Sequence, residues 1–304
     1  RAAVTRAGLE GGEIEDLTMG CALTQGTGGI NAARHVVMAA NLPDGVAAAT
    51  IDRQCASGLN ALAIAASQIR EGAQVVAAGG MDSISLVQND QWNGHRYRIN
   101  AVRDGYYLPM LDTAENVAKA CGVTRAAQDT YALQSQGRMA AAQAAGLFAD
   151  EIVPVTAMRR VTDKATGETR LEQVTLNADE CNRPGTTAEG LAALPPVRDG
   201  GMVTAGNASQ MSDGAAALTL MSATEAARRG LAPLGACRGF AVAGCPPEEM
   251  GLGPIHAIPR LLARHGLRVQ DIDLWEINEA FAAQLLPCRD QLGIDPERLN
   301  VNGG

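Results

Sequence analysis

The sequence is almost without lysine, and this scarcity limits the kinds of partner that the protein can bind. Only Lys119 and Lys164 are lysines, and the other 23 of the 25 basic residues are arginines. The formal net charge is −8 and the sequence pI is about 5.1, whereas a nucleic-acid or anionic-membrane surface needs a dominant basic face. We therefore expect no nucleic-acid partner, and an anionic ligand would have to meet a local group of arginines.

The chain also lacks paired cysteines, long apolar runs and a signal peptide. Its seven cysteines include no Cys-x-x-Cys pair, and this odd set fits neither a disulfide framework nor a zinc site. No apolar stretch is long enough to span a bilayer, and Arg1 begins no signal-peptide pattern. These absences predict no metal site, no membrane partner and a reducing, cytoplasmic location.

Strand-like and helical patterns alternate along the first part of the chain, which is typical of an α/β sheet. They cover Leu17–Leu23, Asn31–Asn41, Val46–Ile51, Ser57–Glu71 and Ala73–Ala78. From about Met81 to Arg198 the alternation is replaced by polar stretches with two predicted helices, Thr113–Ala120, capped by Asp112 and Glu115, and Arg125–Ala145. Alternation resumes with a strand at Ala215–Met221, a helix capped by Ser222, and a strand at Leu234–Val242. The stretch from about Met81 to Arg198 is therefore expected to be a long inserted subdomain.

A weak internal repeat and the two chain ends bear on the organisation of the protein. The segment Arg1–Leu9 is echoed by Arg260–Leu267, which suggests two similar halves, although a glycine and a leucine after a helix are also an ordinary cap. The chain starts inside a predicted helix and stops at Gly304, directly after an apparent strand end. We therefore expect that both ends are truncations.

Cys55 follows a predicted strand and precedes a segment without charge. Residues 56–68 contain no Asp, Glu, Lys or Arg, so they are expected to form a buried helix. A thiol at the start of such a helix faces unpaired N–H groups and the positive end of the helix dipole, which stabilise a thiolate. Gly58 would allow a ligand or another backbone to approach closely. The alternative, which spacing alone favours, is a small buried cysteine of the core.

A series of short strings resembles the signatures of the thiolase family, in the family's order and along essentially the whole chain. The first two are Asp52-Arg-Gln-Cys-Ala-Ser-Gly58 and Gly79-Gly-Met-Asp-Ser-Ile-Ser85. The others are Asp112–Ala118, Glu151–Val155, Arg183–Thr187, Val203–Ser209, Asp213–Ala216, Met250–Pro254, Asn278–Gln284 and Asn300–Gly304. So many ordered matches make a chance resemblance negligible.

The resemblance implies the thiolase fold, in which two similar α/β halves are stacked as layers of helix, sheet, helix, sheet and helix. Residues 1–84 and 211–233 would form the N-terminal α/β half, and residues 85–210 an inserted loop subdomain that binds coenzyme A. Residues 234–304 would be a partial C-terminal half. Members of the family are dimers or tetramers, so a homodimer or homotetramer is expected.

The resemblance also implies an activity. The protein would transfer an acetyl or acyl group between an acyl-coenzyme A and acetyl-coenzyme A through a cysteine thioester. Such transfer forms or cleaves a 3-ketoacyl-coenzyme A such as acetoacetyl-coenzyme A. Coenzyme A and acetyl-coenzyme A would be substrates, and no tightly bound cofactor is expected.

Two residues match catalytic positions of the family. Cys55 would be the nucleophile, and its backbone N–H would serve the oxyanion hole for the thioester carbonyl. Asn278 would hold a water in the oxyanion hole for the enolate of acetyl-coenzyme A. The alternative role of Asn278 is the N-cap of a helix that starts at Glu279.

Six residues match positions that bind coenzyme A or the acyl group. Ser209, with Ala205 beside it, would contact the pantetheine arm, although this loop is otherwise an ordinary turn. Arg183 would lie near the nucleotide end, where a solvated loop arginine is the alternative. Met110, Met250 and Phe281 would line the acyl pocket, and without the resemblance they would be ordinary core residues.

Two family motifs are missing from the 304 residues. Thiolases carry a Gly-His-Pro motif, whose histidine activates the nucleophile, and a Cys-x-Gly-Gly-Gly motif, whose cysteine shuttles the proton. The four histidines, His35, His95, His256 and His265, stand in other contexts, and Cys288 lacks the glycines of the second motif. We therefore expect the natural chain to extend past Gly304, and residues 1–304 alone to acylate slowly at best.

Two other functions are compatible with the same residues. A chain without those motifs could be a non-catalytic protein that keeps a coenzyme A-binding surface. A decarboxylating ketoacyl synthase on the related fold is a weaker alternative, because that group uses two histidines and lacks the Asn-Glu-Ala-Phe string that begins at Asn278.

Overall fold

The structure is a computed structural model that describes residues 1–304 apart from the side chain of residue 100. The chain forms two compact units. The first unit comprises Arg1–Tyr97 and Met211–Phe240, and the second comprises Arg98–Gln210 and Ala241–Gly304. Among the described residues, no helix has the length and apolar character that crossing a bilayer requires.

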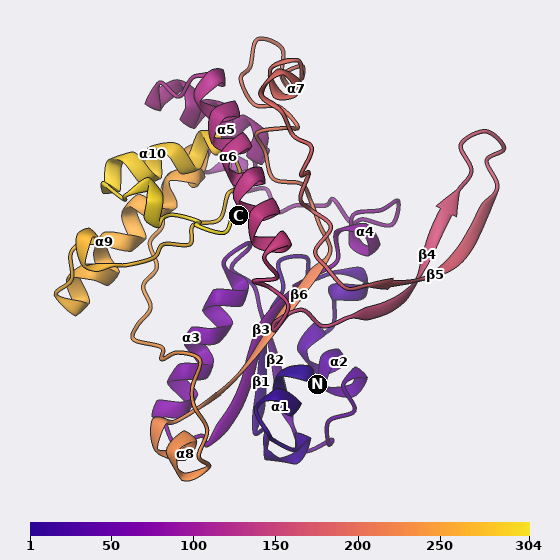
Figure 1. Ribbon diagram of the computed structural model, residues 1–304, viewed down its shortest axis with the longest axis vertical. Helices are drawn as coiled ribbons and strands as arrows, with labels where there is room; N and C mark the ends of the chain where they lie inside the picture. Colours follow the sequence, from indigo (N-terminus) through magenta and orange to yellow (C-terminus); the bar gives the residue numbers. More distant parts are fainter. The chain divides into compact units, whose positions relative to one another are not determined.

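A four-stranded sheet with the strand order β2-β1-β3-β6 forms the centre of the first unit (Figure 1). The strands are β1 (Asp16–Gly20), β2 (Ala47–Ile51), β3 (Val75–Asp82) and β6 (Gly214–Met221). β1 runs parallel to β2 and to β3, whereas β6 runs antiparallel to β3. The helices of this unit are α1 (Ala2–Arg6), α2 (Ala32–Ala39), α3 (Ser57–Arg70), α4 (Ile84–Val87) and α8 (Ala223–Arg228).

Alternate residues of the strands belong to two hydrophobic cores, one on each face of this sheet. On one face Leu17, Met19 and Val75 pack with Val37 of α2. On the other face the core contains Val76 and Ala78 of β3, with Ala61 and Ala65 of α3. This alternation follows from the two-residue period of a strand.

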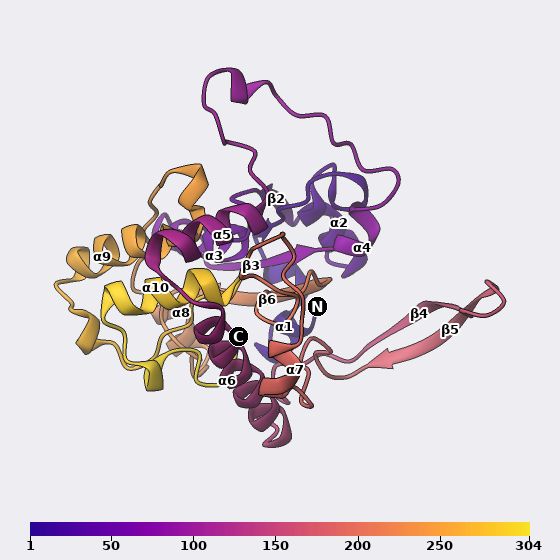
Figure 2. The same cartoon turned by 90° about the horizontal axis from the view of Figure 1, so that it is seen from above.

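The second unit is mainly helical and includes a β-hairpin. Its helices are α5 (Met110–Cys121), α6 (Arg125–Ala144), α7 (Ala188–Ala192), α9 (Gly253–His265) and α10 (Ala282–Leu292). Figure 2 shows β4 (Val155–Thr162) and β5 (Thr169–Leu176) as a long antiparallel ribbon. The core of this unit contains Leu285 and Leu286 of α10, Tyr131 of α6, Ile277 and Leu299.

Most elements of the first unit lie within a few residues of their predicted bounds, but other predictions were wrong. The hairpin β4–β5 was not predicted, and the segment predicted as the strand Leu234–Val242 belongs to neither sheet. A strand forms only where a neighbouring strand accepts and donates its hydrogen bonds, which local sequence does not specify. Helix α5 begins at Met110 after Pro109, so Asp112 and Glu115 do not cap it.

The helix of residues 56–68 is less buried than predicted. Helix α3 presents Ala61 and Ala65 to the sheet, whereas Leu59 on another face is 64% exposed. An absence of charge therefore marked a helix with one buried face rather than a fully buried one.

Candidate functional site

A tight turn between β2 and α3 presents Cys55 at the surface of the first unit. Gln54 has a φ of +49°, a left-handed conformation that is rare for residues other than glycine. The Gln54 backbone N–H donates to Asp52 Oδ1 at 2.7 Å. The Ser57 hydroxyl accepts from the Arg53 N–H at 2.7 Å and donates to the Gln54 carbonyl at 2.5 Å. These side chains hold the turn, and Cys55 is exposed on it.

Cys55 stands just before the helix rather than inside it. Helix α3 begins at Ser57, with Ala56 at its N-cap, and no acidic residue lies in its first turn. The N-terminal end of a helix carries partial positive charge, and nothing in this first turn neutralises that charge. Cys55 therefore lies beside the positive end of α3, two positions before its first residue.

Glycines allow the start of α3 to lie directly on the end of the sheet. A Cβ added to Gly20, the last residue of β1, would lie 2.2 Å from the Ser57 carbonyl carbon. A Cβ on Gly80 of β3 would lie 3.1 Å from the Gly58 Cα. Gly58 thus allows another backbone to approach closely, as predicted, and that backbone is β3.

A carboxylate organises the neighbouring loop at the same end of the sheet. Asp82, the last residue of β3, accepts from the N–H groups of Ala22 and Leu23 at 2.9–3.1 Å. The Cys21 thiol points to Asp82 Oδ1 at 3.5 Å. Asp82 lies in the matched string Gly79–Ser85. These hydrogen bonds give it a local structural role.

Five of the other six cysteines are less exposed than Cys55. All seven are free, and only Cys55 and Cys237 are exposed among the thiols described. Burial raises the pKa of four thiols: Cys21 to about 11, Cys288 to about 12, and Cys121 and Cys245 above their usual value. These four thiols stay protonated near neutral pH and are poor nucleophiles.

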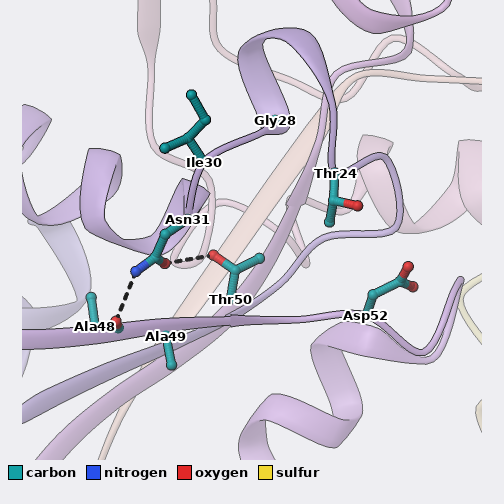
Figure 3. Close-up of a pocket in the computed structure, with 8 residues that line it drawn as sticks. All are labelled: Thr24, Gly28, Ile30, Asn31, Ala48, Ala49, Thr50 and Asp52. Atoms are coloured by element: carbon teal, nitrogen blue, oxygen red, sulfur yellow. Dashed lines mark hydrogen bonds between the residues drawn. The ribbon is translucent and has the colours of Figure 1, made fainter. Parts of the chain in front are cut away.

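A pocket of about 420 Å³ lies beside β2 in the first unit (Figure 3). Asn31 lies in it and bridges to β2, because its Nδ2 donates to the Ala48 carbonyl at 3.0 Å and its Oδ1 accepts from the Thr50 hydroxyl at 2.8 Å. Ile30 and Asn31 have φ of +50° and +59°. The polar groups of Asn31 and Thr50 are therefore occupied by structural contacts, and Cys55 does not line this pocket.

In the second unit, carboxylates of α5 and α6 hold the loop that carries Ala205 and Ser209. The Glu115 carboxylate accepts from the N–H groups of Met202 and Val203 at 2.8–3.0 Å. Asn207 donates to Asp129 Oδ1 at 2.9 Å and accepts from the Thr204 N–H at 2.8 Å. Ala205 and Ser209 are exposed on this supported loop.

The loop of Ser209 is joined to the segment that follows Asn278. The Ser209 N–H donates to the Ala280 carbonyl at 2.9 Å, and the Ala282 N–H donates to the Asn207 carbonyl at 3.0 Å. Two of the matched strings thus lie side by side.

Asn278 is exposed, and its amide makes no hydrogen bond among the described residues. Helix α10 begins only at Ala282, with Phe281 at its N-cap, so the alternative role of Asn278 as the cap of a helix starting at Glu279 is wrong. The cause is tertiary, because the Glu279 side chain binds Tyr131 and Ser135 of α6, which lie far from it along the chain.

Glu279 is the centre of a hydrogen-bond network. It accepts from the Tyr131 hydroxyl at 2.6 Å, the Ser135 hydroxyl at 2.5 Å and Asn300 Nδ2 at 2.7 Å. Burial and the Glu279 carboxylate raise the pKa of Tyr131, so its phenol stays a donor. Burial and Glu279 also raise the pKa of Glu276.

Sequence reasoning gave none of these three donors a role. Asn300 lies within a matched string, whereas Tyr131 and Ser135 lie four residues apart on α6 and hence on one face of that helix. The spacing was visible in the sequence, but the carboxylate that both residues meet is far from them along the chain.

The remaining predicted ligand residues lie in different surroundings. Arg183 is exposed, and its Nη1 donates to the carbonyls of Glu180, Cys181 and Asn182 at 3.1–3.2 Å. Met110 and Met250 are 40% and 42% exposed. Phe281 is only 9% exposed and packs with buried residues of α5 and α10.

Comparisons with known proteins decide the family. Residues 1–224 match the family described as "Thiolase, N-terminal domain", and residues 231–304 match "Thiolase, C-terminal domain". The chain belongs to the thiolase family. A 3-ketoacyl-CoA thiolase of Bacillus subtilis (strain 168) is 47% identical to this thiolase, over 98% of this chain and 77% of that protein. An acetyl-CoA acetyltransferase of Cupriavidus necator is 42% identical, over 100% of this chain and 79% of that protein.

Solved structures agree with this assignment and show that this thiolase has the thiolase fold. The crystal structure of the Bacillus anthracis acetyl-CoA acetyltransferase superposes with a TM-score of 0.86 at 38% identity, covering 100% of this chain and 78% of that one. The human mitochondrial 3-ketoacyl-CoA thiolase gives the same TM-score of 0.86 at 36% identity and the same two coverages. The predictions of the family and of the fold are therefore confirmed.

Proposed function

We propose that this thiolase transfers an acyl group between coenzyme A thioesters, with Cys55 as the nucleophile. The observation that carries the proposal is the Cys55 turn, which is strained, exposed and set before an uncharged helix start in a chain of the thiolase family. Relatives at 47% and 42% identity are named 3-ketoacyl-CoA thiolase and acetyl-CoA acetyltransferase. Acetoacetyl-coenzyme A is the simplest substrate of the corresponding class.

The chemistry has two parts. The Cys55 thiolate adds to the ketone carbonyl of a 3-ketoacyl-coenzyme A, the bond between C2 and C3 breaks, and acetyl-coenzyme A leaves as its enolate. Water bound to Asn278 would stabilise the enolate oxygen, and the Cys55 N–H would stabilise the thioester oxygen. The free coenzyme A thiol then takes the acyl group from Cys55.

The ligand contacts follow the same proposal. Ser209 and Ala205 would contact the pantetheine arm, because they are exposed on the loop joined to the Asn278 segment. Arg183 would meet the nucleotide end with the guanidinium nitrogens that its own loop does not use. Met110, Met250 and Phe281 would line the acyl pocket, with Phe281 the least exposed of the three.

We further infer the setting of this activity. Coenzyme A thioesters would be substrates, with no tightly bound cofactor, in a cytoplasmic homodimer or homotetramer. The seven free cysteines favour a reducing compartment, and β2 offers an unpaired edge of its sheet for association. Residues 1–84 and 211–233 would be the N-terminal half, 85–210 the coenzyme A-binding loop subdomain and 234–304 part of the C-terminal half.

The proposed function is tested by acylation of Cys55. The protein is mixed with acetoacetyl-coenzyme A, and its intact mass and peptide map are recorded over time, with Cys55→Ala as the control. A single acetyl group on Cys55, together with loss of the acetoacetyl-coenzyme A enolate absorbance, is the expected result. An unmodified Cys55, or the same label in Cys55→Ala, contradicts the proposal.

A further inference from the structure

The segment around Asn278 has an unusual source of rigidity. Residues 277–281 belong to no helix or strand, so apart from one isolated bridge at Phe281 a backbone ladder does not fix them. Instead, the Asn300 side chain takes both backbone groups of Ile277: its Oδ1 accepts from the N–H at 2.9 Å, and its Nδ2 donates to the carbonyl at 2.8 Å. The residue before Asn278 is thereby held by a side chain.

The residue after Asn278 is held even more firmly. Three neutral donors from two other parts of the second unit, Tyr131, Ser135 and Asn300, converge on the Glu279 carboxylate. Charge-assisted hydrogen bonds of this kind are stronger than neutral ones. Glu279 has no cationic partner among the described residues, so these three donors compensate the cost of its burial.

The support continues into residues that are themselves constrained. Asn300 is 1% exposed and has a φ of +45°, a conformation that costs free energy unless surrounding contacts maintain it. Its N–H donates to the Trp275 carbonyl at 2.8 Å. The Asn278 side-chain amide is therefore exposed and without a hydrogen bond among the described residues, and the residues before and after Asn278 are both held by side chains.

We propose that Glu279, held by Tyr131, Ser135 and Asn300, is a positioning residue that fixes the orientation of the Asn278 amide for the step that forms the enolate. The inference rests on the proposed function for its catalytic meaning. An amide that must hold a water in place gains from a backbone that does not move, because a preorganised donor costs no reorganisation during the reaction.

Two acyl donors separate positioning from mere stability. Acetoacetyl-coenzyme A acylates Cys55 by carbon–carbon cleavage, and its leaving group is an enolate that takes a proton from water. Acetyl-coenzyme A gives the same acetyl-Cys55 by thioester exchange, and its leaving group is the coenzyme A thiolate. Only the reaction with acetoacetyl-coenzyme A uses Asn278. A defect in positioning therefore slows acylation by acetoacetyl-coenzyme A and leaves acylation by acetyl-coenzyme A unchanged.

The experiment measures both acylation rates in Tyr131→Phe and Glu279→Gln, with Thr130→Val as a matched control. Thr130 lies on the same helix, and its hydroxyl donates only to the Ala126 carbonyl of that helix. Loss of one hydrogen bond in Tyr131→Phe should slow acylation by acetoacetyl-coenzyme A several-fold to about tenfold, and leave acetyl-coenzyme A acylation within about twofold. In an Asn278→Ala background the Tyr131→Phe substitution should have no further effect.

A second measurement does not depend on activity. The side-chain amide signal of Asn278 in isotope-labelled protein is assigned from its absence in Asn278→Ala. This signal should shift or broaden in Tyr131→Phe and Glu279→Gln but not in Thr130→Val. If neither donor labels Cys55 in the unsubstituted protein, the proposed function fails, and this signal alone decides the positioning. Equal slowing with both donors, or an unmoved Asn278 signal in both variants, overturns the inference.

Discussion

Cys55 combines exposure with a strained turn, whereas five of the other six cysteines are not exposed. A strained left-handed residue precedes it, and the start of α3 follows two positions later. Backbone strain of this kind persists only where neighbouring contacts maintain it, and here Asp52 and Ser57 supply them. The exposed position of the thiol therefore depends on the folded turn.

We expect iodoacetamide to alkylate Cys55 faster than any other cysteine near neutral pH. Cys55 is exposed beside the start of α3, whereas burial raises the pKa of Cys288 to about 12. Exposed Cys237 is the matched control, because it is also accessible but follows no such turn. Peptide mapping after timed labelling gives the rates, and equal rates for Cys55 and Cys237 would show that exposure alone explains the labelling.

A methyl group at Gly20 should disturb the start of α3. In Gly20→Ala the Cβ would lie 2.2 Å from the Ser57 carbonyl carbon and 2.4 Å from the Gly58 nitrogen, both backbone atoms that cannot rotate away. Overpacking of this kind costs about 1–3 kcal/mol of unfolding free energy. Urea denaturation measures the loss, and Gly45→Ala, whose Cβ meets nothing within 4 Å, is the control. Equal stability of the two variants would contradict this account of the close approach.

The Arg183 guanidinium is expected to contribute modestly to binding of coenzyme A. An exposed arginine interacts through screened charge, so Arg183→Ala should weaken binding by about 1 kcal/mol. Isothermal titration calorimetry with coenzyme A measures the change. Unchanged affinity would leave Arg183 as a residue that only binds the carbonyls of its own loop.

At the level of elements, the weak sequence repeat corresponds to a repeated local structure. Helices α1 and α9 both end at a left-handed glycine, Gly8 and Gly266, with φ of +66° and +63°. The following leucines donate in the same way, Leu9 to the Val4 carbonyl and Leu267 to the Leu262 carbonyl. Each cap is followed by a short 3₁₀ turn, Gly11–Glu13 and Val269–Asp271.

The first residues of these two turns extend the similarity. The Glu10 N–H donates to the Glu13 carboxylate at 2.8 Å, and the Arg268 N–H donates to the Asp271 carboxylate at 2.9 Å. Such agreement supports two similar halves beyond the ordinary pairing of a glycine with a leucine after a helix. That residues 234–304 form part of the second half stays a prediction.

The loop of Ser209 should depend on Glu115 of α5. Glu115→Ala removes the acceptor for the N–H groups of Met202 and Val203, and a partly buried donor left without a partner costs about 1–3 kcal/mol. Urea denaturation should show this loss, and hydrogen exchange at both amides should become faster. The control is Glu189→Ala, which removes an exposed carboxylate from α7. Slow exchange in Glu115→Ala would mean that other contacts hold the loop.

At the scale of the first unit, an ion-pair network joins the two chain segments that form it. Arg229 binds Glu13 at 2.6 Å and Glu225 at 2.5 Å, and Arg228 binds Glu225 at 2.7 Å. Glu13 belongs to the first segment and the other residues to the second, which returns to the sheet as β6. The network therefore links distant parts of the sequence.

This network predicts how stability depends on pH. Hydrogen bonds from Arg228 and Arg229 lower the pKa of Glu225 from 4.5 to about 2. Because the folded pKa lies below the unfolded one, the contribution to stability is present above about pH 4.5 and is lost as the pH falls toward 2. Thermal unfolding across this range should show the Glu225→Gln variant converging with the unsubstituted protein at low pH. A difference that is independent of pH would exclude Glu225 as the titrating group.

The sequence by itself determined the family, the alternating elements of the first unit and the position of Cys55 after a strand. These features depend on local periodicity, on caps and on short strings, all of which are written in neighbouring residues. It also predicted the bounds of α3 and α6 to within one residue, because the signals that begin and end those helices are local.

Only the tertiary structure decided what surrounds Asn278. The predicted cap at Asn278 was wrong because Glu279 meets Tyr131 and Ser135, which lie 148 and 144 residues away along the chain. The segment Leu234–Val242 has strand-like residues but pairs in neither sheet, whereas the unpredicted β4 and β5 pair with each other. Hydrogen-bond partners of this kind depend on which distant residues the fold brings together, and a local pattern contains no record of them.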